Sequence, residues 1–174
     1  MPVESALVAL IPEAERVVGG FRARFDPSAA AGVPPHITII YPFKLPWELS
    51  MSDIQKLSEL FAGTPSFRVR FTRTGTFPAV LYLAPEPAGP FLQLTAGVSR
   101  LFPETPPYCG KFADIVPHLT VAHSGDAQEL ARIAGDFRRQ TASCLSIDAD
   151  VNEVVLMDNE SGRWQVRYRF PLEA

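Results

Sequence analysis

The chain has 174 residues, of which 47% are hydrophobic and 20% are charged, and its formal net charge is −3 at pH 7. This length suits one domain with a buried core, and the acidic balance argues against a protein that grips long nucleic acids by bulk electrostatics, although a local basic groove remains compatible with it. The longest apolar runs fall far short of the ~20 residues that a membrane-spanning helix needs, so we expect no membrane association.

The N-terminal segment MPVESALVALIPE has an acidic residue and no basic residue before its apolar run, which is not typical of a signal peptide. The two cysteines, Cys109 and Cys144, stand in no CxxC or Cys/His spacing, so the sequence predicts neither a disulfide framework nor a zinc site. We therefore expect a reducing, cytoplasmic location, no metal or other cofactor, and a monomer.

Apolar periodicity divides the first half of the chain into alternating strands and helices, separated by connections rich in Pro and Gly. Runs of β-branched or alternating apolar residues predict strands, and apolar residues at spacings of three and four predict helices. We predict strands at 5–11, 36–39, 67–71 and 80–84, helices at 13–25 and from Ser50 or Ser52 to Gly63, and a turn at 74–78.

The second half repeats this order. LAPE at 83–86 resembles LIPE at 10–13, and each leads to a helix, a Pro-rich loop and a Pro-His-x-Thr sequence. We predict a strand at 118–121, helices at 91–102 and 126–140, one long or bulged strand at 144–158 and a closing strand at 164–170. The expected fold is α+β: a single domain, 1–174, of two interleaved lobes related by a pseudo-twofold axis, each an antiparallel sheet with helices on its outer face, around a central groove.

Two related motifs carry the candidate chemistry, PPHITIIYPF at 34–43 and PHLTVAH at 117–123. Because successive side chains of a strand point to opposite faces, His36 and Thr38 emerge on one face, and so do His118 and Thr120. A strand can carry His and Thr for no chemical reason. The repetition of the pair, with the same preceding Pro, favours a functional interpretation.

The segments HITI at 36–39 and HLTV at 118–121 resemble the paired His-x-Thr-x motifs of the 2H phosphoesterase superfamily, and the similarity extends over nearly the whole chain. The most similar branch is the bacterial 2′-5′ RNA ligase and RNA 2′,3′-cyclic phosphodiesterase group. The resemblance implies an enzyme that acts, without a metal, on an RNA 3′ end or small nucleotide carrying a 2′,3′-cyclic phosphate, and that can also run in reverse as a ligase.

Two histidines facing one groove can perform this reaction. One imidazole removes a proton from the nucleophile and the other gives a proton to the leaving oxygen, and both roles suit a group that titrates near pH 6.5. The hydroxyls of Thr38 and Thr120 can donate hydrogen bonds to the non-bridging phosphate oxygens. The residues alone do not assign the two roles; family precedent for a 2′-phosphate product makes His118 the base and His36 the acid.

Further substrate contacts have two interpretations each. Phe77 and Tyr108 lie in Pro-containing loops and can stack on a nucleobase, or they cap the core. A set of arginines alternates with apolar residues in two predicted strands; these arginines line the groove if their face is that of the histidines, or otherwise lie on a solvated outer face. The set comprises Arg68, Arg70, Arg167 and Arg169.

His123 is the third histidine of the chain, five residues after His118. On a regular strand this odd separation sends the two rings to opposite faces, so joint metal binding would require a bulge. Two other functions stay open. One is a non-catalytic module that binds RNA ends or nucleotides, which the intact His and Thr pairs count against, and the other is a phosphodiesterase for another small cyclic phosphate, such as an ADP-ribose derivative.

Overall fold

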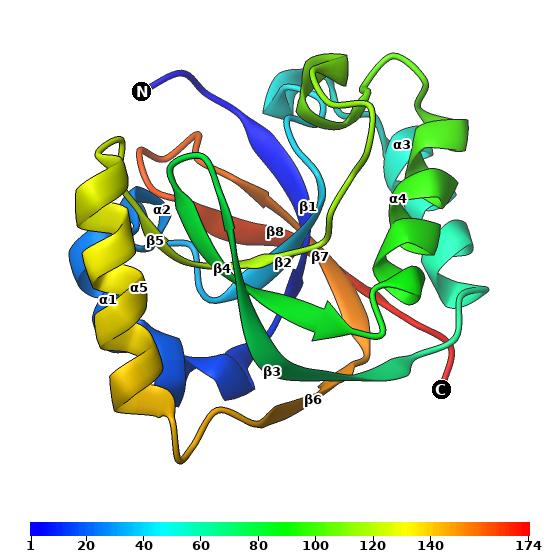
Figure 1. Cartoon of the computed structure of the whole chain (residues 1–174). Helices are drawn as coiled ribbons and strands as arrows, with labels where there is room; N and C mark the ends of the chain where they lie inside the picture. Colours follow the sequence, from blue (N-terminus) through cyan, green and yellow to red (C-terminus); the bar gives the residue numbers. More distant parts are fainter.

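The computed structural model describes all 174 residues as two four-stranded antiparallel sheets and the helices that cover them (Figure 1). The strands are β1 (Ser5–Leu10), β2 (His36–Ile40), β3 (Phe67–Phe77), β4 (Val80–Glu86), β5 (Leu119–His123), β6 (Ile147–Val151), β7 (Glu153–Asp158) and β8 (Gln165–Pro171). The α-helices are α1 (Glu15–Phe25), α2 (Pro27–Ala30), α3 (Met51–Ala62), α4 (Gly89–Leu101) and α5 (Ala127–Thr141), with short 3-10 turns at Pro12–Ala14, Pro46–Glu48 and Pro107–Gly110. None of these helices combines the length and apolar character needed to cross a bilayer.

The two sheets have matching strand orders, β2-β1-β7-β8 in the first and β5-β4-β3-β6 in the second. Each motif strand therefore forms an edge and pairs with the strand that opens its own repeat, β2 with β1 and β5 with β4. The chain crosses between the sheets twice: β3, which follows the first motif and α3, lies in the second sheet, and β7, which follows β6, lies in the first. The predicted α+β class and two-lobed arrangement are confirmed.

The helices pair on opposite sides of the molecule, α1 with α5 and α3 with α4 (Figure 1). Helix α1 follows β1 but packs against β5, and α4 follows β4 but packs against β2. Helix α3 begins at a capping box, in which the Ser50 hydroxyl accepts from Asp53 N–H and the Asp53 carboxylate accepts from Ser50 N–H. Its buried face, which includes Leu57 and Phe61, joins a core of 34 side chains drawn from both sheets. Burial of this shared core makes the two repeats depend on each other.

The predicted strand at 144–158 is wrong as a single element. It breaks at Asn152 into β6, which pairs with β3, and β7, which pairs with β1, so the chain crosses from one sheet to the other at that residue. The predicted turn at 74–78 also differs. Strand β3 continues to Phe77, and the hairpin turns through Pro78 and Ala79, whose φ is +69°.

A β-bulge in β8 changes which side chains share a face. Val166 lies opposite Met157, whereas Tyr168 lies opposite Leu156, so the extra residue is Arg167. Val166 therefore packs in a small cluster on the inner face of the first sheet, while Phe170 packs in the main core on the other face. The alternation of arginines and apolar residues predicted along this strand therefore breaks at Arg167.

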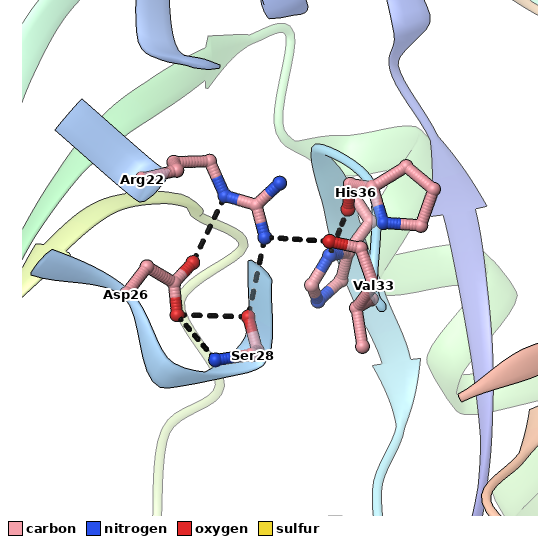
Figure 2. A network of polar contacts seen from close by, with 6 residues as sticks. Arg22, Asp26, Ser28, Val33 and His36 are labelled. Carbon is pink, nitrogen blue, oxygen red and sulfur yellow. Dashed lines mark hydrogen bonds and ion pairs between the residues drawn. The ribbon is translucent and has the colours of Figure 1, made fainter. Parts of the chain in front are cut away.

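Arg22 organises the connection that leads into the first motif (Figure 2). The residue is 2% exposed, and its guanidinium lies 2.9 Å from the Asp26 carboxylate and also donates to the Ser28 hydroxyl at 3.2 Å and to the Val33 carbonyl oxygen at 2.9 Å. Asp26 accepts in turn from the N–H and the hydroxyl of Ser28 at the start of α2. The network therefore holds the backbone from α1 to a point three residues before His36.

We expect Arg22→Ala to lower the free energy of unfolding by about 3–5 kcal/mol, because it leaves the Asp26 carboxylate buried without a partner. Arg16→Ala is the matched control, since Arg16 is exposed on the same helix, and it should change the free energy by less than about 0.5 kcal/mol. Urea denaturation measures both values. Equal effects of the two substitutions would show that the network does not stabilise the fold.

Candidate active site

The two motif strands, β2 and β5, lie side by side, although neither belongs to the other's sheet. His36 begins β2, and His118 immediately precedes β5. Both rings are half-buried, and a charge on His118 lowers the pKa of His36. Two imidazoles from distant parts of the sequence therefore share one electrostatic environment.

Each imidazole is held by a backbone carbonyl two residues earlier in the chain. His36 Nδ1 lies 2.8 Å from the Pro34 carbonyl oxygen (Figure 2), and His118 Nδ1 lies 2.8 Å from that of Val116. A carbonyl oxygen can only accept, so Nδ1 carries the proton in both rings, and in the neutral form Nε2 is left with a free lone pair. The same local contact thus gives both histidines the same tautomer.

Burial shifts both histidines toward the neutral form. Loss of solvation lowers the pKa of His36 from 6.5 to about 4; the Arg22 guanidinium adds to this, while the hydrogen bond to Pro34 and the Asp26 carboxylate oppose it. Loss of solvation also lowers the pKa of His118, opposed by its bond to Val116. The assumption that both imidazoles keep their ordinary pKa is therefore wrong. In the absence of a bound anion, both rings are bases at neutral pH.

The motif threonines lie two residues after the histidines and are half-buried like them. Thr38 is in β2. Burial raises the pKa of the Tyr108 hydroxyl, and the Thr38 side chain opposes this with a smaller lowering effect. Thr120 is in β5 and lies opposite Tyr82 of β4. The Tyr108 backbone N–H also donates to the Tyr41 carbonyl oxygen at 2.7 Å, which ties the loop before the second motif to the end of the first.

A cavity of about 640 Å³ opens beside His118 and contains both aromatic residues expected to contact substrate, Phe77 and Tyr108. The Phe77 ring stacks on Tyr82 with centroids 4.4 Å apart and meets the His118 ring edge-on at 5.1 Å. Tyr82 lies across from Gly75, where a Cβ would collide with its ring. Gly75 thereby lets an aromatic platform form next to the imidazole.

A second cavity, of about 370 Å³, opens beside His36 and Thr38. Its wall includes Trp164 and Tyr41, whose ring centroids are 6.4 Å apart, and the Tyr41 hydroxyl donates to the Glu4 carboxylate at 2.8 Å. Sequence reasoning missed these three residues. Tyr41 is within the first motif segment, but Glu4 and Trp164 reach the cavity only through the pairing of β1 with β7 and β7 with β8.

The four arginines predicted as substrate contacts lie in ion pairs instead of in these cavities. Arg68 is 2.9 Å from Asp150 and Arg70 is 2.7 Å from Asp148, each pair directly across the β3–β6 ladder. Arg167 contacts Asp158 at 2.9 Å and Glu160 at 3.4 Å. Arg169 pairs with Glu153. No Lys or Arg lines either cavity that contains a motif histidine.

His123 is exposed at the end of β5 and lines a separate depression with Asp26 and Glu129. Strand β5 does contain a bulge, because the register shifts between Thr120 and Ala122. Even so, no group of three His, Cys, Asp or Glu side chains is arranged to hold a metal ion.

Comparison with known proteins identifies the family of the chain. The chain matches the 2′-5′ RNA ligase superfamily over residues 10–163. A Bacillus licheniformis protein that carries the name "Putative phosphoesterase" is 26% identical over 162 residues, covering 91% of both chains. One from Geobacillus kaustophilus, named in the same way, is 28% identical over 159 residues, covering 86% of this chain and 84% of its own.

Solved structures share the fold. Escherichia coli LigT complexed with NADP+ is 20% identical with a TM-score of 0.61 and 99% coverage of both chains. A protein from Thermus thermophilus is also 20% identical, with a TM-score of 0.63 and 98% coverage of both chains. The chain thus belongs to the 2′-5′ RNA ligase superfamily, and so to the 2H phosphoesterases.

Proposed function

We propose that this protein is a metal-independent phosphodiesterase that opens 2′,3′-cyclic phosphates on RNA ends or nucleotides, and that His36 and His118 are its acid–base pair. The observation that carries the proposal is the matched tautomer of the two rings, because hydrogen bonds from Nδ1 to backbone carbonyls leave both Nε2 atoms free for proton transfer. A histidine with only a structural role needs no free ring nitrogen, and two such histidines have no reason to leave the same nitrogen free. An acid–base pair needs a free nitrogen on each of its two rings.

In the proposed reaction, one histidine accepts a proton from water as the water oxygen attacks phosphorus. The bond from phosphorus to one ribose oxygen breaks, and the other histidine gives that oxygen its proton, which yields a phosphomonoester. The pKa of His36 is lowered more strongly than that of His118, to about 4, so His36 loses its proton more readily. This difference favours His36 as the base and His118 as the acid. This assignment reverses the one that family precedent suggests.

Substrate binding supplies the negative charge that keeps one histidine protonated, which the free site lacks. The phosphate carries a negative charge, and placing it between the rings raises the pKa of both imidazoles, so one of them can hold the proton that the acid must donate. Thr38 and Thr120 would donate hydrogen bonds to the non-bridging oxygens. The Phe77–Tyr82 platform and Tyr108 would hold the nucleobase by stacking beside His118.

Nucleotide complexes of a relative with the same fold support this substrate class. Escherichia coli LigT has been crystallised with 3′-AMP and with NADP+. A non-catalytic nucleotide-binding module remains the second candidate, and turnover in EDTA separates the two. We also propose a reducing, cytoplasmic setting, which suits two exposed cysteines that form no disulfide.

We expect His36→Ala and His118→Ala each to reduce kcat on a nucleoside 2′,3′-cyclic phosphate to background, a loss of about 10²–10⁴-fold, because each removes a proton-transfer group. His123→Ala is the matched control and should keep the wild-type rate, since this ring lies outside both cavities. Initial rates in EDTA provide the measurement. Normal turnover by either motif variant would contradict the mechanism.

Thr38→Val and Thr120→Val keep the shape of the side chain and remove its hydroxyl. We expect kcat to fall by about 10–1,000-fold, less than for the histidine variants, because one donor to the developing charge is lost while proton transfer remains. Steady-state kinetics on the same substrate test this order. Loss confined to KM, with kcat unchanged, would mean that the hydroxyls bind the ground state only.

The pH dependence of kcat/KM should be bell-shaped, with its maximum between about pH 4 and 6.5. The ratio kcat/KM reports on the free enzyme, whose productive form has one protonated and one neutral histidine. That form is most populated at pH values between the two lowered pKa values. The profile of kcat should lie at higher pH, because bound phosphate raises both pKa values. A maximum of kcat/KM above pH 7, or a monotonic profile, would be inconsistent with the pair.

A further inference from the structure

Arg22 lies behind the first motif, and its network reaches His36 through the backbone (Figure 2). Building on the proposed function, we propose that Arg22 is a positioning residue for His36, because it fixes the segment whose carbonyl orients the imidazole, and that no side chain does the same for His118. Arg22 lines neither cavity that contains a motif histidine. It therefore acts through this segment and not on the substrate.

Two contacts fix the segment that leads into His36. The Val33 carbonyl oxygen accepts from the Arg22 guanidinium at 2.9 Å, and the next carbonyl oxygen, that of Pro34, lies 2.8 Å from His36 Nδ1. The ring of Pro34 locks its φ angle, so little freedom separates the two carbonyls. A shift of the Val33 carbonyl therefore moves the acceptor that orients the His36 ring.

Further contacts hold the backbone on both sides of His36. The Ile11 N–H donates to the Pro35 carbonyl oxygen at 2.8 Å. The buried Thr95 hydroxyl, from α4, donates to the Ile39 carbonyl oxygen in β2 at 2.9 Å. His36 therefore stands on a stretch of backbone that is bonded to two other parts of the chain besides Arg22.

The segment before His118 has no such contacts. Residues 112–117 form no backbone–backbone hydrogen bond, and the one side-chain hydrogen bond to this stretch is that of the His118 ring with the Val116 carbonyl oxygen. Val116 is 46% exposed, whereas Val33 is buried. The two imidazoles make the same local contact, but only that of His36 is fixed by the rest of the fold.

The ion pair of Arg22 and Asp26 also places two opposite charges near His36. Loss of solvation is the main cause of the lowered pKa of His36, and its bond to a backbone carbonyl opposes it. Among the charged groups, Arg22 lowers this pKa, Asp26 raises it and His118 lowers it. Glu4 is the other charged side chain in the same cavity. The pKa of His118 depends on burial and its own backbone contact, so the ion pair acts on one histidine only.

Paired substitutions separate this positioning role from support of the fold. Arg22→Met removes a positive charge, so the pKa of His36 should rise toward 6.5, whereas Asp26→Asn removes a negative charge and should lower it further. The pKa of His118 should not change in either variant. NMR titration of the histidine side chains measures these values, with Arg16→Met, an exposed position on the same helix, as the matched control. General loosening of the fold would instead hydrate both rings and raise both pKa values in every variant.

The double variant Arg22→Met/Asp26→Asn leaves no buried charge without a partner and keeps an acceptor for the Ser28 N–H, so it carries the test where a single variant fails to fold. Because the two charge changes oppose each other, the pKa of His36 should rise less than in Arg22→Met. The lost bond to Val33 should let the ring populate the tautomer with the proton on Nε2. For the same reason kcat on a nucleoside 2′,3′-cyclic phosphate should fall by about 10–100-fold, while the control variant keeps the wild-type rate.

Three results would overturn the inference and leave Arg22 with a structural role only: shifts of the His36 pKa in the same direction in both single variants, equal shifts at His118, or a double variant with the wild-type tautomer and kcat. Failure of the proposed function is visible separately, as no turnover of the cyclic nucleotide by the wild-type protein. The pKa and tautomer of His36 then still test the role of Arg22, because these measurements need no substrate.

Discussion

Two hydrogen bonds, from His36 Nδ1 to the Pro34 carbonyl and from His118 Nδ1 to the Val116 carbonyl, set the chemistry of this protein. They join each ring to the backbone that leads into its own strand, so the orientation of the imidazole follows from the path of the chain. Because the acceptors are carbonyls, the proton stays on Nδ1 and the reactive nitrogen is Nε2 in both repeats. No carboxylate is needed to orient either ring.

The rest of the fold brings these two units together. Each motif strand is the edge of its own sheet, and the two edges lie side by side. One shared core then links the repeats, so neither imidazole can move far without disturbing both lobes. The burial that results lowers both pKa values, and a bound phosphate becomes the group that restores a proton to the pair.

The sequence predicts most of the features that follow from the periodic spacing of apolar residues. Alternation along β2 places His36 and Thr38 on one face, and the Ser50 cap and the apolar spacing of α3 identify that helix. Features that depend on the register between paired strands cannot be predicted from the sequence. The bulge at Arg167 and the crossing at Asn152 leave no periodic signal, and the ion pairs of the four arginines depend on which strands become neighbours. For the same reason the cavity of Glu4 and Trp164 cannot be found by scanning along the chain.

The most direct test of the account is the protonation state of the three histidine side chains, measured by long-range ¹H–¹⁵N correlation NMR near pH 7.5 with and without a nucleoside 2′-phosphate. The account predicts that His36 and His118 are both neutral with the proton on Nδ1, and that both spectra change when the nucleotide binds, while His123 gives no response. A proton on Nε2 of either motif histidine in the free protein, or a response of only one of the two to the nucleotide, would contradict it.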